Sequence, residues 1–396
     1  MKIIERTQYL NKLINVIGTP DIKVITGVRR SGKSKLMGSF IDYLSKDKTN
    51  NIIHINFNLT SFESLLEYHK LEEYIDNHYV SSKNNFVLID EVQMCKGFEK
   101  AINSIHSKEI YDIYITGSNA FLMSSDLATL FTGRTYEVKV FPFSFSEYKK
   151  YYNLESNYPG FDEFLHEGGM AGSYLYKEEA DKREYIKNIY NTLIVRDIKQ
   201  KYNIKKSLLL DKISDYLIDN ISNITSNRNI ANDLTSLKDE INHKTVGNYL
   251  SYLCNAFLFY KVQRYDVVGK KYLSSSYKYY LVDQSFRYSI LGGKNADTGR
   301  MLENIVAVEL LRRGYELYVG TLYKTEIDFV AIKNGIKTYI QVSDDITNKN
   351  TFLRETSSLL KIRDAYPKIL IARTRSEKYQ YEGIEVIDIA DWLVNY

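Results

Sequence analysis

Residues 25–37 read ITGVRRSGKSKLM, a segment that places glycine and positive charge directly after an apolar run. The apolar run DIKVIT (21–26) predicts a buried strand, and KSKLMGSFIDYLS (33–45) predicts a helix. Residues 27–34 between them match G-x-x-x-x-G-K-[ST], in which glycines let main-chain N–H groups converge on phosphate oxygens. This order of strand, loop and helix predicts a phosphate-binding loop in an α/β domain.

The charged and hydroxyl residues of this loop have distinct expected roles. Lys33 would reach the β- and γ-phosphates of a nucleotide, and the Ser34 hydroxyl would ligate Mg²⁺. The start of the helix adds the positive end of its dipole. The expected ligands are ATP and Mg²⁺, although the sequence leaves GTP open. The expected nucleotide-binding residues are Gly27, Arg29, Arg30, Ser31, Gly32, Lys33 and Ser34.

A second apolar run, NNFVLIDEVQ (84–93), predicts a strand that ends in two acidic residues. In a P-loop ATPase, an aspartate at such a strand end holds Mg²⁺, and a following glutamate polarises the attacking water. We therefore assign Asp90 to the metal and Glu91 to the water.

Two further polar candidates lie downstream. The strand predicted over YDIYIT (111–116) is followed by Ser118 and Asn119. Asn119 is the candidate for orienting the water or contacting the γ-phosphate, and Ser118 is the second choice. The alternative is that this position caps the next helix.

Arg134 follows a glycine and precedes a predicted strand. A single arginine can stabilise charge on a transferred phosphoryl group, either in its own chain or in a neighbouring copy. The alternative is a surface arginine that pairs with Glu137, Asp126 or Glu147.

Together, the motifs GVRRSGKS, FVLIDEVQ, TGSNAFLMSSDLATLFTGR and FPFSFSEY resemble the N-terminal half of a prokaryotic family of AAA-like P-loop ATPases. The resemblance continues through GGMAGSYLY, KTVGNYLSYL, EIDFVA and YIQVS, so it covers nearly the whole chain. It implies a sheet of five parallel strands, in which the strand before Asn119 lies between the loop strand and the Asp90 strand. It also implies a winged-helix region and a C-terminal domain that resembles the PD-(D/E)XK nuclease fold.

The middle of the chain fits the winged-helix expectation. Three helical patterns, LLLDKISDYLIDNIS, RNIANDLTSL and NHKTVGNYLSYLCNAF, precede two strand-like runs, FLFYKVQRYDV and KKYLSSSYKYYLVD. The third helix of such a module can enter the major groove of DNA, and the tip of the hairpin can contact phosphates. The candidate DNA contacts are His243, Lys244, Thr245, Asn248, Lys270 and Lys271. Packing of this module on the nucleotide domain is an equally open alternative.

Residues 300–396 follow the order helix, three strands, helix, strand, which matches a nuclease-like core. The helix is GRMLENIVAVELLRRG, the strands are ELYVG, EIDFVAIK and KTYIQVSD, and the last pair is FLRETSSLLKIRD and KILIAR. Active enzymes of this type place acids on the first helix and second strand, and E/Q-x-K on the third. Here Glu303 and Asp328 stand at the acidic positions, and Gln341 takes the third.

Ser343 stands where the catalytic lysine of a nuclease is expected. A hydroxyl carries no positive charge and is a poor base at neutral pH. Lys333 and Lys337 flank the preceding turn, but neither has the alternate-residue spacing that would point it inward. We therefore expect a nuclease-like remnant that does not cleave DNA and whose two carboxylates and amide could still hold a weak metal.

Length and composition set the remaining expectations. The chain has 396 residues, of which 44% are hydrophobic and 26% charged, so a globular protein of several domains is expected. The predicted domains are 1–150 (P-loop ATPase), 151–290 (helical and winged-helix) and 291–396 (nuclease-like). A net charge of +4 is too small to decide on nucleic-acid binding. No apolar run reaches membrane-spanning length, so a cytoplasmic protein without a membrane partner is expected. A homo-oligomer is a separate open expectation.

The expected function is ATP binding and hydrolysis, coupled to conformational change in the other two domains, with double-stranded DNA as partner. Two alternatives stay open at this point. One is a nucleotide-gated regulator that binds a protein partner through the two domains predicted over 151–290 and 291–396. The other is an ATP-dependent DNA nuclease.

Overall fold

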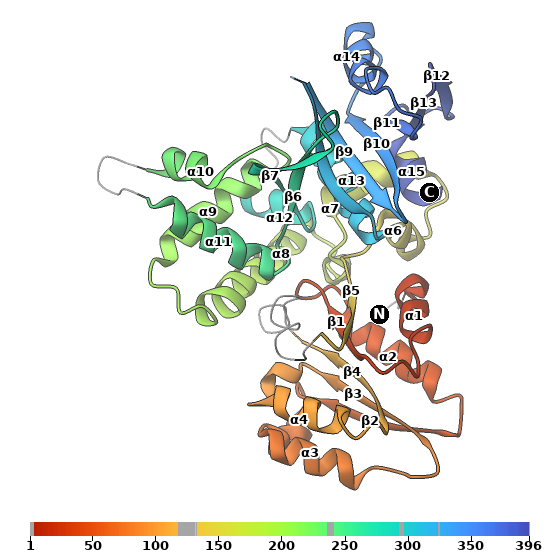
Figure 1. Ribbon diagram of the computed structural model, residues 1–396, viewed down its shortest axis with the longest axis vertical. Helices are drawn as coiled ribbons and strands as arrows, with labels where there is room; N and C mark the ends of the chain where they lie inside the picture. The colour runs from red at the N-terminus through yellow and green to blue at the C-terminus, as the bar shows by residue number, and fades with distance from the viewer. Residues whose placement is uncertain are drawn as a thin grey trace. The chain divides into compact units, whose positions relative to one another are not determined.

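A computed structural model of the chain describes residues 4–117, 131, 133–235, 241–292, 297–323 and 325–395. The chain divides into two compact units, Met1–Phe141 (unit 1) and Pro142–Tyr396 (unit 2), which Figure 1 shows in colour order along the sequence. The proposed boundaries at 150 and 290 stay predictions. Both later parts of that division, residues 151–396, belong to unit 2.

Unit 1 alternates helices and strands. Its described elements are α1 (Thr7–Ile14), β1 (Ile22–Thr26), α2 (Lys33–Leu44), β2 (Asn50–Asn56), the 3₁₀ turn η1 (Thr60–Leu65), α3 (Tyr68–Asn77), β3 (Asn84–Asp90), the 3₁₀ turn η2 (Val92–Met94), α4 (Phe98–His106), β4 (Tyr111–Thr116) and β5 (Thr135–Lys139). The strands and helix predicted around residues 27–34 are confirmed.

The described strands of unit 1 form one parallel sheet in the order β2-β3-β4-β1-β5. The strand β4 therefore lies between β1 and β3, as the family resemblance implies. Since all these strands are parallel, their carboxyl ends meet at one edge of the sheet. The P-loop follows β1 at this edge, and Asp90 is the last residue of β3 there.

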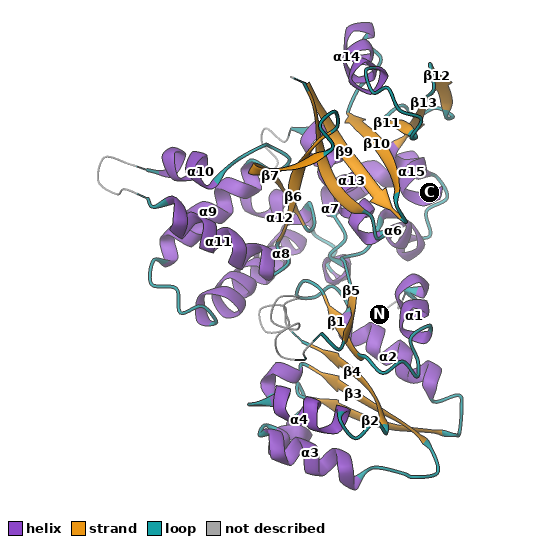
Figure 2. Cartoon of the chain, viewed as in Figure 1, coloured by secondary structure: helices purple, strands orange, loops and turns teal. Residues whose placement is uncertain are grey.

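Both faces of this sheet are covered by helices, as Figure 2 shows. Alternate strand residues such as Ile53, Val87 and Ile113 pack with α3 and α4 in one apolar cluster. On the opposite face, the ring of Phe40 in α2 lies 4.7 Å from that of Tyr114 in β4. Burial on both faces explains why these strands read as continuous apolar runs.

Unit 2 begins with helices and continues into a mixed sheet. Its first described elements are α6 (Phe145–Tyr152), α7 (Asn157–Glu167), the 3₁₀ turn η3 (Ala171–Leu175), α8 (Glu179–Thr192), the π-helical segment η4 (Leu193–Gln200), α9 (Ser207–Asp219), α10 (Asn227–Leu234), α11 (His243–Asn255), β6 (Phe259–Asp266), β7 (Lys271–Leu281) and α12 (Ser285–Leu291).

The remaining elements of unit 2 include all six predicted for the nuclease-like core. They are α13 (Thr298–Arg312), β8 (Glu316–Leu322), β9 (Thr325–Lys333), β10 (Ile336–Ser343), α14 (Lys349–Leu360), β11 (Lys368–Ala372), β12 (Tyr379–Tyr381), β13 (Ile384–Asp388) and α15 (Ile389–Asn395). The last three elements were not anticipated from the sequence.

The described strands of unit 2 form one sheet in the order β12-β13-β11-β10-β9-β8-β6-β7. The predicted hairpin β6–β7 therefore joins the strands that were predicted for a nuclease-like core, because β6 pairs in parallel with β8 from Gln263 to Asp266. This pairing could not be foreseen, since main-chain hydrogen bonds between distant strands leave no signal in the local pattern.

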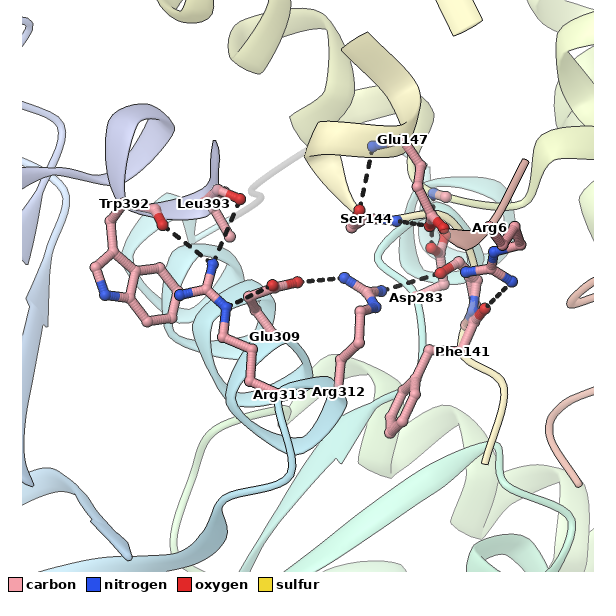
Figure 3. A network of polar contacts seen from close by, with 12 residues as sticks. Arg6, Phe141, Ser144, Glu147, Asp283, Glu309, Arg312, Arg313, Trp392 and Leu393 are labelled. Carbon is pink, nitrogen blue, oxygen red and sulfur yellow. Dashed lines mark hydrogen bonds and ion pairs between the residues drawn. The ribbon is translucent and has the colours of Figure 1, made fainter. Parts of the chain in front are cut away.

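The helix α13 packs against the sheet and is anchored by polar contacts. Arg312 and Arg313 both pair with Glu309, and Arg313 also donates to the main-chain oxygens of Trp392 (3.1 Å) and Leu393 (3.4 Å), as Figure 3 shows. These contacts fix α13 to α15. Within the described ranges, no helix combines the length and the apolar character needed to cross a bilayer.

Candidate functional site

The P-loop takes a conformation that only glycine allows at two points. Gly27 has φ 143°, and a Cβ atom there would lie 2.0 Å from the carbonyl oxygen of Val140. Gly32 has φ 97° and caps the start of α2 without a side chain. The first N–H groups of α2 are therefore left for a ligand rather than for a capping side chain.

The side chains of the loop fit a phosphate ligand. Lys33 is 6% exposed, and its Nζ donates to the carbonyl oxygens of Gly27 (2.9 Å) and Val28 (3.2 Å). Ser31 is 4% exposed, and its Oγ has no hydrogen-bond partner among the described residues. A buried hydroxyl without a partner is costly, so its presence in a phosphate-binding loop supports a ligand there.

The remaining predicted loop residues are more accessible. Ser34 and Arg30 are exposed, and Arg29 is half-buried. Arg30 adopts φ 66°, so the loop uses a left-handed conformation here as well. Ser34 thus lies at the start of α2 with its hydroxyl accessible to a metal ion, next to the buried Lys33.

Arg6 bonds to the main chain of the P-loop and was not among the predicted site residues. Its Nη1 donates to the carbonyl oxygens of Ser31 and Phe141, each at 2.9 Å, and its guanidinium lies 4.5 Å from the ring centre of Tyr9. Figure 3 shows the contact between Arg6 and Phe141. One buried cation thus fixes the P-loop to the end of unit 1.

The acidic pair at the end of β3 has a partner that sequence reasoning missed. Thr116, at the end of β4, donates its hydroxyl to Asp90 Oδ1 and accepts from the main-chain N–H of Glu91 at 3.2 Å. Asp90 is 2% exposed. The available signal was a polar residue at the end of a neighbouring parallel strand, three positions before the candidate Asn119 and two before the second choice, Ser118.

Glu91 differs from Asp90 in exposure and conformation. It is half-buried and adopts φ 59°, a left-handed conformation that ends the extended backbone of β3. Its Oε2 accepts from Gln93 Nε2 at 2.5 Å. Asp90 and Glu91 are therefore held separately, as their separate expected roles require. Ser118 and Asn119 lie outside the described residues.

Arg134 lies at the opposite end of the sheet from the P-loop of its own chain. Its carbonyl accepts from the N–H of Ile22, the first residue of β1, and its side chain is exposed. The five-residue strand β1 separates this position from the loop. At about 3.3 Å per residue, that is roughly 16 Å, which exceeds the reach of an arginine side chain.

The candidate DNA contacts are largely accessible. His243, Lys244 and Asn248 in α11 are exposed and Thr245 is half-buried, while the buried Val246 faces the other helices. Lys270 and Lys271 are exposed at the turn between β6 and β7. Asn242 caps α11 by accepting from the N–H of Lys244 at 2.8 Å.

The elements predicted for a nuclease-like core bring acidic residues together around a lysine that the sequence analysis did not select. Lys278 in β7 is 3% exposed, and its Nζ lies 2.8 Å from Glu303 Oε1 and 2.5 Å from Glu326 Oε1. Tyr280 donates its hydroxyl to the same Glu303 oxygen at 2.7 Å. Lys278 was missed because β7 had been assigned to the wing of a separate module.

The other remnant residues lie on adjacent strands. Asp328 Oδ2 accepts from the N–H of Val342 at 2.8 Å, and Gln341 donates from Nε2 to Glu355 Oε2 at 2.9 Å. Ser343 donates its hydroxyl to the carbonyl oxygen of Asp345 at 3.3 Å.

Two lysines considered from the sequence make other contacts. Lys337 donates to the hydroxyl of Tyr265 at 2.8 Å, and Lys333 lies over the ring of Tyr315 at 5.2 Å.

Burial dominates the electrostatics of this cluster. It raises the pKa of Glu303, against the opposite effect of Lys278. Burial, followed by the carboxylate of Glu303, raises the pKa of Asp328 well above its ordinary value. For Lys278, burial alone would lower the pKa, but the surrounding carboxylates outweigh it and raise the pKa. In the described part of the chain, no three His, Cys, Asp or Glu side chains are grouped to hold a metal ion.

Two regions of the chain match known protein families. Residues 19–149 match a family described as an AAA domain. Residues 158–297 match a family described as a domain of unknown function. Unit 1 thus has the fold of AAA-like P-loop ATPases, as its parallel sheet and loop indicate.

Two relatives extend over the full chain. A Haemophilus influenzae protein described as uncharacterized is 38% identical over 398 residues, with 99% of each chain covered. The uncharacterized protein MJ1544 of Methanocaldococcus jannaschii is 28% identical over 417 residues, covering 99% of this chain and 90% of the relative.

Solved structures show weaker similarity. The Orc1 protein of Aeropyrum pernix, solved in complex with DNA, aligns with 79% of this chain and 94% of its own at 11% identity and a TM-score of 0.31. Cdc6p of Pyrobaculum aerophilum aligns with 77% of this chain and 95% of its own at 9% identity and a TM-score of 0.30.

Proposed function

Because this chain belongs to the same family as the uncharacterized Haemophilus influenzae protein and carries an AAA-like P-loop domain, we propose that it binds and hydrolyses ATP. The observation that carries the proposal is one edge of the unit 1 sheet: the P-loop follows β1 there, and Asp90 and Glu91 stand at the end of β3, with only β4 between the two strands. Phosphate, metal and water would each have a matching group at this edge.

The residues divide the work of phosphoryl transfer. Lys33 and the N–H groups at the start of α2 would bind the β- and γ-phosphates. Ser34 and Asp90 would hold Mg²⁺, which supplies positive charge against the phosphate oxygens. Thr116 fixes the carboxylate of Asp90, and Glu91 would orient the attacking water and accept its proton. Asn119 stays a candidate for contact with the γ-phosphate.

A titration with ATP and GTP, followed by measurement of phosphate release with and without Mg²⁺, tests this function directly. We expect saturable ATP binding and release of phosphate that stops when EDTA removes Mg²⁺. Binding of neither nucleotide by a folded chain would refute the proposal. Preference for GTP would make GTP the substrate, and the proposed reaction would still be nucleoside-triphosphate hydrolysis.

Arg134 is proposed to serve the ATP site of a neighbouring copy. The argument is its position at the amino end of β1, about one strand length from its own P-loop. In a homo-oligomer, mixing an Arg134→Ala chain with a Lys33→Ala chain would leave some composite sites intact. We expect each variant alone to be inactive and the mixture to recover activity. A structural role for Arg134 would give no recovery at any ratio.

Double-stranded DNA is the partner class that we propose for unit 2. The exposed residues of α11 and the two lysines at the β6–β7 turn are the groups that would contact it. Binding through them should weaken as salt rises, because phosphate contacts release counterions. The double variant Lys270→Ala/Lys271→Ala should bind less tightly with a smaller salt dependence, and Lys349→Ala, an exposed lysine of α14, is the control.

A protein partner is the alternative for the same surface. It would be favoured if DNA at low salt neither binds nor changes the rate of phosphate release. The rate with and without duplex DNA therefore separates the two partner classes in one assay.

A further inference from the structure

The acidic remnant of unit 2 does not fit a divalent cation, and the reason lies in the sequence of β7. The nuclease-like fold implies Mg²⁺ between the acid on its first helix and the acid on its second strand. We propose that the ammonium group of Lys278 takes the place of that metal ion, so that the cluster is closed to Mg²⁺ and does not cut DNA. This inference is independent of the ATP site.

The position of Lys278 is the first argument. Its Nζ lies within 2.8 Å of Glu303 on α13 and 2.5 Å of Glu326 on β9, so one cation bridges the helix and the strand that would share the metal. The side chain is 3% exposed, so its charge is balanced by these carboxylates rather than by water. It reaches this point from β7, which is separated from β9 by β8 and β6 in the sheet.

The bonds of the carboxylates are the second argument. Glu303 Oε1 accepts from both Lys278 and Tyr280, and Asp328 Oδ2 accepts from the main-chain N–H of Val342. Mg²⁺ needs near-octahedral oxygen ligands at about 2.0–2.1 Å. A metal at this point would have to displace these donors and stand beside a buried ammonium, and repulsion between the two positive charges opposes that.

The same geometry accounts for Ser343. Active nucleases combine a metal with a lysine on the third strand, so the site needs positive charge from two sources. Here one lysine supplies the compensating charge from β7, and Ser343 turns to the carbonyl of Asp345. A lysine that is fully used in ion pairs is not free to orient a water molecule. The cluster therefore holds β7, α13 and β9 together and has no part in cleavage.

Manganese binding to the nucleotide-free full chain tests the substitution of lysine for metal. The variant Lys278→Met removes the charge and keeps a similar length, so the carboxylates lose their cation. We expect Mn²⁺ to stabilise this variant, raising the unfolding midpoint by roughly 3–6 °C at ten times its dissociation constant. The same concentration should leave the unmodified chain unchanged, when compared with NaCl of equal ionic strength. Trp392, the single tryptophan of the chain, reports unfolding of unit 2.

Two controls locate the effect. The double variant Lys278→Met/Asp328→Asn should lose the response to Mn²⁺, because a carboxylate of the site is gone. Lys261→Met, which removes an exposed lysine from β6, should behave like the unmodified chain. A folded Lys278→Met variant that shows no response to Mn²⁺ would overturn the proposal.

The unmodified chain gives a second test that does not depend on the folding of any lysine variant. It should bind no Mn²⁺, measured by electron paramagnetic resonance, beyond what an Asp328→Asn chain binds. It should also leave supercoiled plasmid intact with Mg²⁺ or Mn²⁺. Binding or cleavage by the unmodified chain that disappears in Asp328→Asn would show that the site accepts a metal beside Lys278, contrary to the proposal.

Discussion

Unit 1 and unit 2 each have a buried lysine at a candidate site, but the two lysines bond to different kinds of group. In unit 1, Lys33 donates to main-chain carbonyl oxygens of its own loop, and Asp90 accepts from the hydroxyl of Thr116. In unit 2, Lys278 pairs directly with two glutamates. These hydrogen bonds join Lys33 and Asp90 to neutral groups, whereas the charges of Lys278, Glu303 and Glu326 compensate one another.

The difference indicates how a fold keeps or loses a ligand site. A charge held by neutral partners can still stabilise an incoming ion, because its own field is not cancelled. A buried ion pair satisfies itself, and breaking it to admit a ligand leaves an uncompensated charge. We therefore expect the substitutions in unit 1 to change chemistry and those in unit 2 to change stability.

The largest expected effect is on the water-activating carboxylate. Glu91→Gln keeps the size and length of the side chain but removes the base. Turnover should therefore fall by about 10²- to 10⁴-fold. ATP affinity should stay close to that of the unmodified chain. Single-turnover phosphate release and a nucleotide titration measure the two quantities, and Glu99→Gln in α4 is the matched control. Equal turnover in both variants would remove Glu91 from the mechanism.

Lys33→Ala should weaken ATP binding by roughly 10²- to 10³-fold, because a charge-assisted contact to the phosphates is lost. Lys35→Ala removes an exposed lysine two residues further along α2 and should bind ATP normally. Isothermal titration calorimetry measures the ATP affinity of the unmodified chain and of the two variants. Similar affinities for the two variants would mean that Lys33 serves only the structure of the loop.

The third prediction concerns a buried acid of unit 2. Burial raises the pKa of Asp283 from 3.8 to about 6, although Ser285 and the main chain of Gly169 partly oppose it by donating hydrogen bonds. The folded protein then binds a proton more tightly than the unfolded chain does. Its free energy of unfolding should therefore fall as pH rises from about 4 to 6, by on the order of 3 kcal/mol, and level off above that.

Asp283→Asn tests this dependence, since the amide does not titrate. The variant should be less stable throughout, because it loses an acceptor for the Gly169 N–H, but its stability should change less between pH 4.5 and 6.5. Urea unfolding followed by Trp392 fluorescence gives both curves. Parallel curves would show that Asp283 does not titrate in this range.

The smallest expected effect is on the threonine that orients the acidic pair. Thr116→Val keeps the shape of the side chain but removes the donor to Asp90 and the acceptor for the Glu91 N–H. The Mg²⁺ concentration that gives half-maximal ATPase activity should rise about 10-fold, as is typical when a group that orients a metal ligand is removed. Thr49→Val, which removes a hydroxyl bonded to Asp47, should leave it unchanged.

The sequence by itself determined the elements that rest on local chemistry. The pattern of glycines, Lys33 and Ser34 between a strand and a helix predicted the P-loop, since few other sequences allow φ of 143° and 97° at the required points. Apolar periodicity predicted the strands that end in Asp90 and at Thr116, and the helices and strands of the nuclease-like core. These predictions hold because each depends on residues within one or two turns of chain.

Only the tertiary structure decided which distant residues meet. The parallel pairing of β6 with β8 places the hairpin in the mixed sheet of unit 2, in which Lys278 contacts Glu303 and Glu326. The sheet register likewise places Arg134 at the far end of β1 from the P-loop. Strand pairing is made by main-chain groups that every residue shares, so the local sequence does not encode it. The partners of Lys278 depend on that pairing, and no spacing rule identifies them.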